Sequence, residues 1–341
     1  MSCADRTEQL SRWYASWSSL TPQELLPVAG DASFRRYFRV PHAGASVILC
    51  DAPPETEKNA EFVALAEGLA TAGLRVPTVL HADLEQGFLA LEDLGDQTLL
   101  PLLNAQTVDE YYAGALGMLQ DLATAEAADF SVLPYDRAHL AREMALFPEW
   151  FCQGLLGVDA HTDTADSFAA LANLLCDRAL AQTQVVVHRD FHARNLMLLA
   201  DGSLATIDFQ DAVLGPLTYD PVSLLKDCYL RWPNARVRDW ALMHRERLAA
   251  RGVAVPEAAD FLMDFDFMGL QRHIKVLGIF ARLYLRDSKP GYLQDLPRVM
   301  GYVQSTLERY PNVPALASFA AWLDQDVMPA VYQQAWFHAS R

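Results

Sequence analysis

One stretch in the middle of the chain, residues 185–209, most constrains what this sequence can fold into. It begins with three valines, continues as His188-Arg189-Asp190-Phe191-His192-Ala193-Arg194-Asn195, and ends with Ile207-Asp208-Phe209. Short apolar runs separated by polar residues predict a buried strand, a loop and then a hairpin. The carboxylates and the amide supply one candidate general base and two candidate ligands for a hard cation such as Mg²⁺.

The hairpin predicted between Asn195 and Asp208 depends on the Asp-Gly turn at residues 201–202. Asp-Gly between two apolar runs is typical of a two-residue turn in which both central residues have positive φ. Such a turn pairs Ala200 with Ser203 and, counting outward, places Asn195 directly opposite Asp208. Opposed residues lie on one face with Cβ atoms about 5 Å apart, so the two side chains are expected to share one Mg²⁺ ion. A register shift of one residue would remove this alignment.

Asp190 is the candidate general base. It follows the apolar strand, lies at the start of the loop and precedes Asn195 by five residues. A carboxylate in this position can accept a hydrogen bond from a substrate hydroxyl and take its proton during phosphoryl transfer. A single aspartate after a strand is usually a turn or cap residue, and an isolated Asp-Gly hairpin is usually only a hairpin. The order and spacing of Asp190, Asn195 and Asp208 together predict the chemistry.

Length and charge narrow the class of protein. With 341 residues, 52% of them hydrophobic, the chain can bury a large core, and its length suggests two domains or lobes. The net charge of −16 argues against nucleic acid and against an anionic membrane as partners, because both require a basic surface. The same charge is compatible with a cationic substrate or simply with a well-solvated acidic surface.

Cysteine usage and hydropathy favour a soluble cytoplasmic protein. The cysteines are odd in number, scattered and without C-x-x-C spacing, which fits a reducing compartment and offers no metal site. They are Cys3, Cys50, Cys152, Cys176 and Cys228. The first residues contain no apolar signal segment, and no apolar stretch reaches the roughly 18 residues that a membrane helix needs.

The first 95 residues predict a small antiparallel sheet with one inserted helix. Apolar residues at helical spacing predict a helix at 6–19, and Thr21-Pro22 predicts a second helix start with Thr21 as N-cap. The remaining elements expected here are strands at residues 33–40, 46–50 and 87–91, and a helix at about 59–72.

After residue 95 the pattern becomes mostly helical. Helical spacing recurs at 108–122 and 168–179. Further helices are expected at about 219–231, 236–251, 260–287, 295–310 and 315–325. We therefore predict an α+β protein with a small antiparallel-sheet lobe at residues 1–95 and a larger, mostly helical lobe at residues 96–341.

This organisation resembles the aminoglycoside phosphotransferase and choline kinase-like branch of the kinase fold, over nearly the whole chain. It is more closely similar to bacterial kinases that phosphorylate the anomeric hydroxyl of N-acetylmuramate and N-acetylglucosamine in cell-wall recycling. The segments that carry the resemblance are 30–40, 51–55, 91–96, 187–192 and 207–211, with Gly215-Pro216 and Tyr219-Asp220. The resemblance implies an ATP- and Mg²⁺-dependent phosphotransferase whose partner is a small-molecule amino sugar.

The resemblance also implies roles for residues of the nucleotide-binding N-terminal lobe. The turn containing Gly30, Ser33 and Phe34, followed by Arg35, would cover the nucleotide phosphates with backbone N–H groups. Only one glycine is present, so the turn alone would be an ordinary hairpin. Glu92 and Leu94 would form the hinge that holds adenine through backbone groups.

The resemblance assigns Asp220 a role after the metal-binding segment. It would bind the backbone of the catalytic loop, although a plain helix N-cap is an equal alternative for an aspartate at this position.

One departure from the kinase pattern concerns the lysine of the third strand, which normally holds the α- and β-phosphates. The corresponding strand, residues 46–51, contains no lysine, and the next one is Lys58. Arg35, Arg36 or Arg39 is a candidate replacement, or the metal alone suffices. A nucleotide-binding pseudokinase without turnover is the remaining explanation.

Candidate acceptor residues lie in two places. His192 and Arg194 belong to the catalytic loop, where His192 is either a substrate contact or a structural histidine. Arg272 and His273, with Lys275, form a basic cluster on an otherwise apolar helix. This cluster either meets an anionic group such as a lactyl carboxylate or pairs with carboxylates of the chain itself. An aminoglycoside or choline-like aminoalcohol kinase is the alternative function, because the acidic chain suits a cationic acceptor.

Overall fold

The computed structural model describes residues 3–20, 25–28, 35–126, 130, 132–159 and 164–339. The chain divides into two compact units of two segments each. The first, here called the sheet unit, comprises Met1–Val132 and Ala193–Asp211. The second, the helical unit, comprises Leu133–His192 and Ala212–Arg341. The two units are defined by which residues contact each other most within the chain. The lobe boundaries expected from the sequence, 1–95 and 96–341, stay a prediction.

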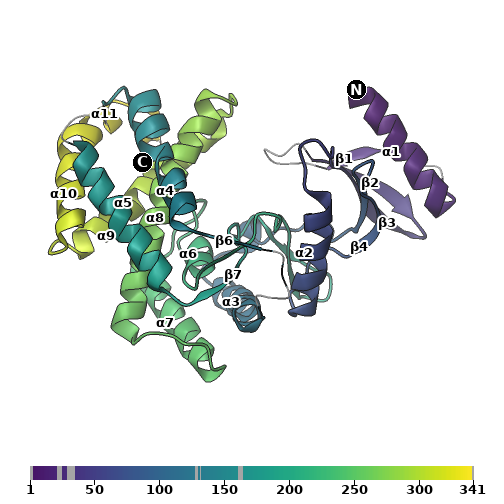
Figure 1. The fold of residues 1–341 in the computed structure, drawn as a ribbon, viewed down its shortest axis with the longest axis horizontal. Helices are drawn as coiled ribbons and strands as arrows, with labels where there is room; N and C mark the ends of the chain where they lie inside the picture. The colour runs from purple at the N-terminus through teal and green to yellow at the C-terminus, as the bar shows by residue number, and fades with distance from the viewer. Residues whose placement is uncertain are drawn as a thin grey trace. The chain divides into compact units, whose positions relative to one another are not determined.

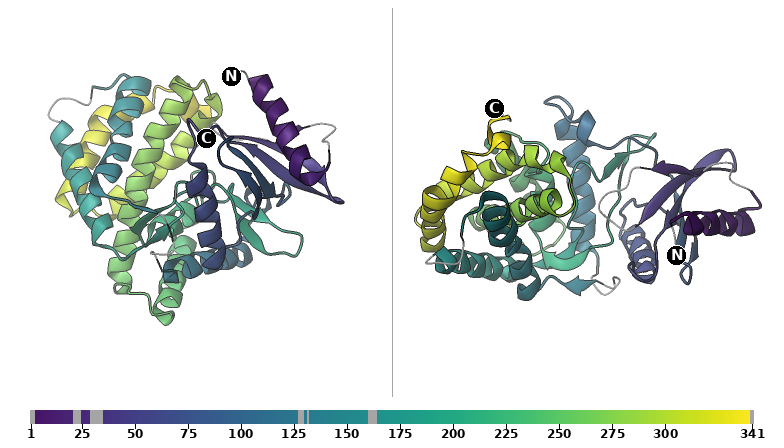
Figure 2. Two further views of the ribbon diagram at one scale, coloured as in Figure 1. Left: turned by 45° about the vertical axis from the view of Figure 1, so that its right-hand side comes forward. Right: turned by 90° about the horizontal axis from the view of Figure 1, so that it is seen from above.

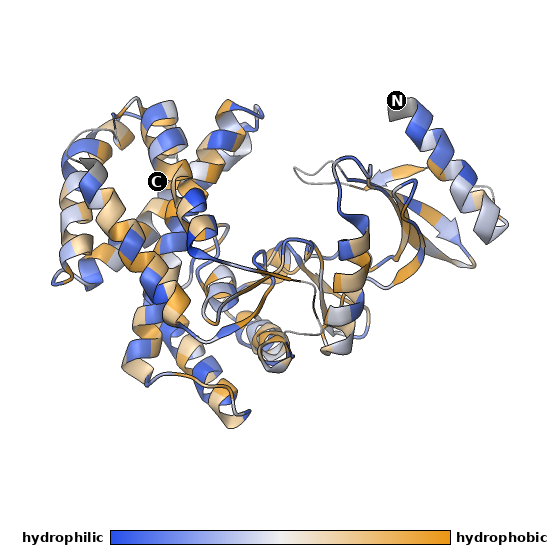
Figure 3. Cartoon of the chain, in the orientation of Figure 1, coloured by the Kyte–Doolittle hydropathy of each residue, from blue (hydrophilic) through white to orange (hydrophobic). Residues whose placement is uncertain are grey.

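The sheet unit is built on five antiparallel strands in the order β1-β2-β3-β5-β4 (Figure 1). Their bounds are β1 Leu26–Val28, β2 Arg36–His42, β3 Ala45–Asp51, β4 Val79–Asp83 and β5 Phe88–Glu92. The three predicted strands correspond to β2, β3 and β5. Figure 3 shows apolar residues interspersed with polar ones along the strands, as expected for a sheet with one face covered.

Helix α1 (Cys3–Ser18) covers one face of this sheet, a packing that the views of Figure 2 also show. Its Leu10, Trp13 and Tyr14 are buried against alternate strand residues. Those strand residues are Phe38, Val40, Val47, Leu49, Phe88 and Ala90. Alternate residues of a strand share a face, so the predicted helix at 6–19 and the strand pattern specify one apolar interface. The helix start predicted at Thr21-Pro22 lies outside the described residues.

Three further elements complete the sheet unit: α2 (Asn59–Thr71), α3 (Val108–Thr124) and a hairpin of β8 (Leu196–Leu198) and β9 (Leu204–Thr206). Short η1 (Leu100–Leu102) precedes α3. Helix α2 buries the predicted apolar stripe, Phe62, Leu65, Ala66 and Leu69. The hairpin is fixed on both edges, because Leu99 N–H donates to Leu196 O (2.8 Å) and Thr206 N–H donates to Arg75 O (2.8 Å).

The helical unit contains a small sheet in the order β6-β10-β7 surrounded by helices. The strands are β6 Leu133–Pro134, β7 Gln184–Val187 and β10 Val213–Pro216. The helices are α4 Arg137–Met144, α5 Thr164–Ala181, α6 Tyr219–Leu225, α7 Asn234–Ala250, α8 Ala258–Leu285, α9 Leu296–Arg309, α10 Pro314–Trp322, α11 Met328–Val331 and α12 Ala335–Ala339. The π-helical segments η3 (Phe147–Leu155) and η5 (Leu323–Val327) and the 3-10 segment η4 (Pro290–Asp295) connect them.

Helix α8 is the core of the helical unit and is contacted by α4, α5, α6, α7, α9 and η3. Most of its side chains are buried. Gly278 permits the close crossing, because a Cβ at this position would lie 2.4 Å from the backbone carbonyl carbon of Leu146. The helix predicted at 219–231 is shorter than expected, since α6 ends at Leu225. None of the helices that the structure describes is both long and apolar enough to cross a membrane.

Candidate active site

The predicted catalytic loop, residues 188–195, begins where β7 ends. Val186 and Val187 are buried, and Val187 pairs with Val213 of β10, so the loop starts from a fixed strand. Asp190 lies in irregular backbone three residues past the end of β7 and is partly exposed. The predicted placement of Asp190, at the start of a loop that follows a buried strand, is confirmed.

Asp220 of α6 holds this loop in place. Its carboxylate accepts the backbone N–H groups of His188 (2.6 Å) and Arg189 (2.9 Å). Arg189 has a φ of 75°, which is uncommon for a non-glycine residue and is sustained by these contacts. Burial raises the pKa of Asp220 to about 7, although the two backbone N–H groups oppose the rise. Of the two alternatives for Asp220, the contact with the loop backbone is confirmed, and Thr218 occupies the N-cap of α6.

Glu143 of α4 is a second support that the sequence did not indicate. It pairs with the Arg189 guanidinium, accepts a hydrogen bond from Tyr135 and lies 2.9 Å from Nζ of Lys275. Burial alone would raise the pKa of Glu143, but Lys275 and Arg189 outweigh it and lower the pKa. A glutamate on a short polar helix matches no motif, so sequence reasoning had no signal for it.

The charges around Asp190 favour its ionised form. Burial raises the pKa of Asp190, but the positive charges of Lys275, His192 and Arg272 together lower it below its usual value. An ionised carboxylate can accept a hydrogen bond from a hydroxyl group and then its proton. The electrostatic surroundings therefore suit the predicted base.

The basic cluster on α8 separates into three environments. Lys275 pairs with Glu143, as the self-pairing alternative predicted. His273 is fully buried, with Nε2 2.9 Å from Lys226 O and its ring stacked 4.5 Å from that of Tyr302. The His273 ring therefore packs in the core, and its assignment to the substrate stays a prediction. Arg272 is buried, with its guanidinium over the Tyr219 ring.

His192 and Arg194 lie in the loop but belong to different units. The His192 ring is partly exposed and meets Tyr229 edge-to-face at 5.4 Å. Arg194 is exposed. Both alternatives for His192 stay open, because a partly exposed ring packed against one aromatic neighbour is compatible with either.

The hairpin register differs from the prediction by one residue. Leu196 pairs with Thr206 and Leu198 with Leu204, so Asn195 lies opposite Ile207, whose N–H donates to Asn195 O (3.0 Å). The turn contains three residues, 200–202, of which Gly202 alone has positive φ (84°). The two-residue turn and the direct opposition of Asn195 and Asp208 were therefore wrong, because Asp-Gly also fits a three-residue turn with glycine last.

Asp208 and Asn195 are nevertheless adjacent. Asn195 Nδ2 lies 3.3 Å from Asp208 Oδ2. Asp208 has a φ of 64°, a left-handed conformation that interrupts the alternation of side chains along a strand. We attribute the contact to this backbone conformation, which offsets the shifted register.

The pair fits a magnesium site better than a closed metal site. Asp208 is exposed and accepts a hydrogen bond from Gln210 Nε2 (2.6 Å), while Asn195 is buried. Within the described ranges, no cluster of three or more His, Cys, Asp or Glu side chains is arranged to hold a metal. Mg²⁺ typically binds one or two carboxylates, substrate phosphates and water rather than an all-protein cage. The Asp208 carboxylate beside the Asn195 amide matches this coordination preference.

Arg35 is the described member of the predicted nucleotide turn, since Gly30, Ser33 and Phe34 lie outside the described residues. It is buried, its Nε lies 3.1 Å from Glu57 Oε2, and its guanidinium covers the Phe62 ring at 4.7 Å. Phe62 in turn stacks on Phe209 at 4.9 Å. Arg35 is thereby connected through α2 to the segment that carries Asp208.

Arg36 and Arg39, the other candidate replacements for the strand lysine, are paired with carboxylates. Arg36 Nε lies 3.0 Å from Asp51 Oδ2. Arg39 Nε lies 2.6 Å from Asp93 Oδ2, and Ser46 donates to the same carboxylate. Burial raises the pKa of Asp93, but Arg39 and Ser46 outweigh it, so the net shift is downward.

Of the two residues of the predicted hinge, Glu92 is the last residue of β5 and Leu94 follows two positions later. Glu92 N–H donates to Thr78 O (2.9 Å), and its carboxylate accepts Arg75 Nη1 (2.7 Å) and Thr78 Oγ1 (3.1 Å). Leu94 is partly exposed. These contacts fix the start of the segment, and its role toward adenine stays a prediction.

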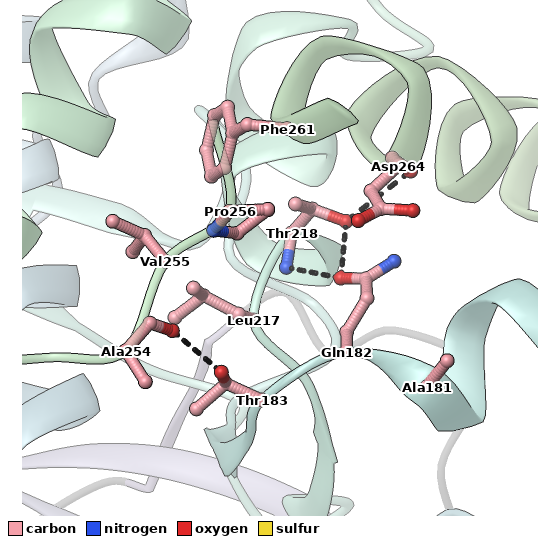
Figure 4. A pocket seen from close by; sticks show the side chains of 10 residues that line it. All are labelled: Ala181, Gln182, Thr183, Leu217, Thr218, Ala254, Val255, Pro256, Phe261 and Asp264. Atoms are coloured by element: carbon pink, nitrogen blue, oxygen red, sulfur yellow. Dashed lines mark hydrogen bonds between the residues drawn. The ribbon is translucent and has the colours of Figure 1, made fainter. Parts of the chain in front are cut away.

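The helical unit also contains a cavity of about 300 Å³ (Figure 4). Its lining comes from 181–183, 217–218, 254–256 and the first turns of α8. Thr218 donates to Gln182 Oε1 (2.8 Å) and Thr183 to Ala254 O (2.5 Å). None of the predicted site residues lines this cavity.

Known proteins are similar to this chain in sequence and in fold. The sequence pattern of the family described as "Phosphotransferase enzyme family" matches residues 24–246. A protein of Pseudomonas aeruginosa named N-acetylmuramate/N-acetylglucosamine kinase is 42% identical over 95% of this chain and 99% of its own. A Neisseria meningitidis protein of the same name is 40% identical over 91% of this chain and 94% of its own.

Solved structures share the fold at low identity. A putative aminoglycoside phosphotransferase from Ralstonia eutropha has a TM-score of 0.64 and 13% identity, covering 90% of this chain and 98% of its own. A choline kinase from Streptococcus pneumoniae has a TM-score of 0.60 and 13% identity, covering 88% and 99%. The predicted α+β kinase-like fold is confirmed by these likenesses.

Proposed function

The chain belongs to the phosphotransferase enzyme family, and we propose that it is an ATP- and Mg²⁺-dependent kinase of amino sugars. Its acceptor is the anomeric C1 hydroxyl of N-acetylmuramate and N-acetylglucosamine, and its products are the 1-phosphates used in peptidoglycan recycling. The observation that carries the proposal is the shared name of relatives that are 40–42% identical over at least 90% of this chain.

In this proposal Asp190 is the catalytic base. It accepts a hydrogen bond from the C1 hydroxyl and takes its proton as the new oxygen–phosphorus bond forms. Its lowered pKa and partial exposure support this role. Asp220 and Glu143 keep the loop in position by holding the backbone and side chain of Arg189.

Asn195 and Asp208 would hold Mg²⁺. When bound, the ion neutralises charge on the phosphate oxygens of the nucleotide. The 3.3 Å separation of the two side chains and the exposure of Asp208 support this assignment.

The nucleotide is assigned to Gly30, Ser33, Phe34, Arg35 and the hinge. Arg35 is buried against Glu57, so we assign it to shaping the nucleotide site through α2. Glu92 and Leu94 hold adenine through backbone groups, which the fixed end of β5 supports.

The amino sugar is assigned to the catalytic loop, with His192 and Arg194 as contacts, while the predicted acceptor residue Arg272 lies buried on α8. We place the reaction in the cytoplasm, with a small molecule as partner and without nucleic acid or membrane, in keeping with the net charge of −16.

An aminoglycoside or aminoalcohol kinase is less well supported. Lys275 and Arg272 are both among the positive charges that act on Asp190, which disfavours a cationic acceptor beside it. A pseudokinase is disfavoured because Asp190, Asn195 and Asp208 are all present in the expected order and spacing along the sequence.

The test is ADP release from MgATP with N-acetylmuramate, N-acetylglucosamine, glucosamine, kanamycin or choline. We expect turnover with both N-acetylated sugars, lost when the C1 hydroxyl is blocked as a methyl glycoside. Turnover only with kanamycin or choline would replace the proposal by the cationic-acceptor alternative. ATP binding without turnover on any acceptor would favour the pseudokinase.

A further inference from the structure

Arg272 is a buried cation whose charge no neighbouring acid neutralises directly. It lies on α8 in the helical unit with 4% of its surface exposed. Across the residues that the structure describes, no carboxylate lies within salt-bridge distance of it, and its Nε has no hydrogen-bond partner. Its guanidinium lies over the Tyr219 ring at 5.6 Å.

Lys275, three positions further along the same helix, shows the contrast. Its Nζ lies 2.9 Å from Glu143 Oε1 and 3.2 Å from Tyr219 Oη. A buried charge is costly unless it is paired and hydrogen-bonded, and an aromatic face offsets only part of that cost. We therefore expect Arg272 to meet an anion during the reaction.

Two carboxylates act on Arg272 without pairing with it. Asp190 and Asp227 both act on the guanidinium electrostatically and, despite its burial, help to raise its pKa. Asp227 accepts the backbone N–H of Tyr229 (2.9 Å). Since Asp190 is the proposed base, Arg272 and the reacting hydroxyl share one electrostatic environment.

Comparing the two acceptor sugars indicates which anion Arg272 meets. The lactyl group of N-acetylmuramate carries a carboxylate, but N-acetylglucosamine has none. An arginine reserved for that carboxylate would stay uncompensated whenever N-acetylglucosamine is bound. The phosphoryl group is present with every acceptor.

Beside the magnesium site proposed at Asn195 and Asp208, strands β2 and β3 supply no lysine or arginine that lacks a carboxylate partner. Strand β3 contains no lysine, and Arg36 and Arg39 each pair with a carboxylate. Phosphoryl transfer depends on fixed positive charge around the migrating group.

We propose that Arg272 binds the phosphoryl group as it is transferred, a role that rests on the proposed function. In this step the C1 oxygen forms a bond to the γ-phosphorus while the bond from that phosphorus to the bridging oxygen breaks. ADP leaves with the bonding electron pair, and the hydroxyl proton passes to Asp190. Arg272 remains protonated and donates N–H groups to a non-bridging oxygen.

The control for Arg272→Gln is Arg282→Gln, the same change on the same helix at a less buried arginine whose Nε also has no hydrogen-bond partner. Steady-state kcat and KM are measured for N-acetylmuramate and N-acetylglucosamine. Removing one donor to a transition-state oxygen typically lowers kcat by about 10²–10³. We expect that loss, by a similar factor for both sugars, in Arg272→Gln but not in Arg282→Gln.

A rise in KM for N-acetylmuramate alone would overturn the proposal in favour of the carboxylate contact. Unchanged kinetics for both sugars would overturn it in favour of a purely structural cation. The wild type tests the proposed function separately, because its turnover of the two sugars does not depend on the role of Arg272. Should it use another acceptor, the same pair of variants is compared on that acceptor.

A binding measurement covers the case in which Arg272→Gln is poorly folded. Calorimetry of Arg272→Lys, which keeps the charge but loses the planar fork, compares N-acetylglucosamine with its 1-phosphate. Loss of affinity for the 1-phosphate with unchanged affinity for the free sugar supports the proposal. Equal affinities for the 1-phosphate in wild type and variant would contradict it.

Discussion

The arginines of the sheet unit and Arg272 of the helical unit use the same side chain differently. Among the described residues, six sheet-unit arginines meet carboxylates, including Arg35 with Glu57, Arg36 with Asp51, Arg39 with Asp93 and Arg75 with Glu92. In the helical unit, Lys275 and Arg189 share Glu143, whereas Arg272 lies against an aromatic ring. The difference teaches that paired charges here hold elements together, while the buried Arg272, which has no paired acid, is the place where an anion is expected.

The largest expected effect tests whether the chemistry belongs to the helical unit. Asp190→Ala should lower kcat by about 10²–10⁴, because the acceptor hydroxyl loses its base, while ATP affinity stays unchanged. ADP release and calorimetric ATP binding measure the two quantities. Asp201→Ala, at the hairpin turn of the sheet unit, is the control and should keep full turnover. Most of the turnover surviving in Asp190→Ala would refute the assigned base.

The next effect tests the paired charges. Glu143→Gln leaves Arg189 and Lys275 buried without their acid, so the free energy of unfolding should fall by about 3–5 kcal/mol. Urea denaturation followed by circular dichroism measures it. A loss below about 1 kcal/mol would mean that these two cations find other partners, and the contrast with Arg272 would disappear.

A pH series tests the raised pKa of Asp220, the acid that holds the backbone of the catalytic loop. The pKa of Asp220 is raised to about 7 by burial, so between about pH 4 and pH 7 the folded state holds a proton that the unfolded state has released. The contribution of Asp220 to the free energy of unfolding therefore falls as pH rises through this range.

Denaturation of wild type and Asp220→Asn at pH 5 and pH 8 isolates this contribution. Arg272 and Asp190 are the charged neighbours of Asp220, and the variant keeps both. The wild type should lose stability relative to the variant at the higher pH. A difference between the two proteins that is independent of pH would contradict the raised pKa.

The smallest effect is expected for a pair near the surface. Arg75 and Glu92 are 39% and 31% exposed, so solvent screens their attraction. Arg75→Gln should change the free energy of unfolding by no more than about 1 kcal/mol, measured by the same urea titration. A loss as large as that of Glu143→Gln would show that exposure does not separate the two kinds of pair.

Periodicity made most of the secondary structure predictable. Alternation along β2 and β3 and the apolar stripe of α2 each specify a buried face. Strands β1 and β4 were not predicted from the sequence. Strand β1 has only three residues, and β4, at the other edge of the sheet, has no fully buried side chain. Edge strands lack the apolar pattern that marks central ones.

The site was predictable in its chemistry and less so in its geometry. The order of Asp190, Asn195 and Asp208 identified the residues, but the register of the hairpin depended on the length of its turn, and the left-handed φ of Asp208 has no sequence signal. The basic cluster on α8 was visible in the sequence. That Lys275 is paired and Arg272 is not depends on Glu143, which comes from a distant helix.

The sheet unit is built from two separate segments of the chain, and this affects how it folds during synthesis on the ribosome. When the first 132 residues have been made, Leu99 N–H and Arg75 C=O still lack the partners that Leu196 and Thr206 later provide. The ribosome must add all of Leu133–His192 before the hairpin can join, so the unit that begins first is completed late. A nascent chain stopped at residue 132 should expose this edge and be prone to aggregation, whereas one extended past residue 211 contains every strand of the sheet unit.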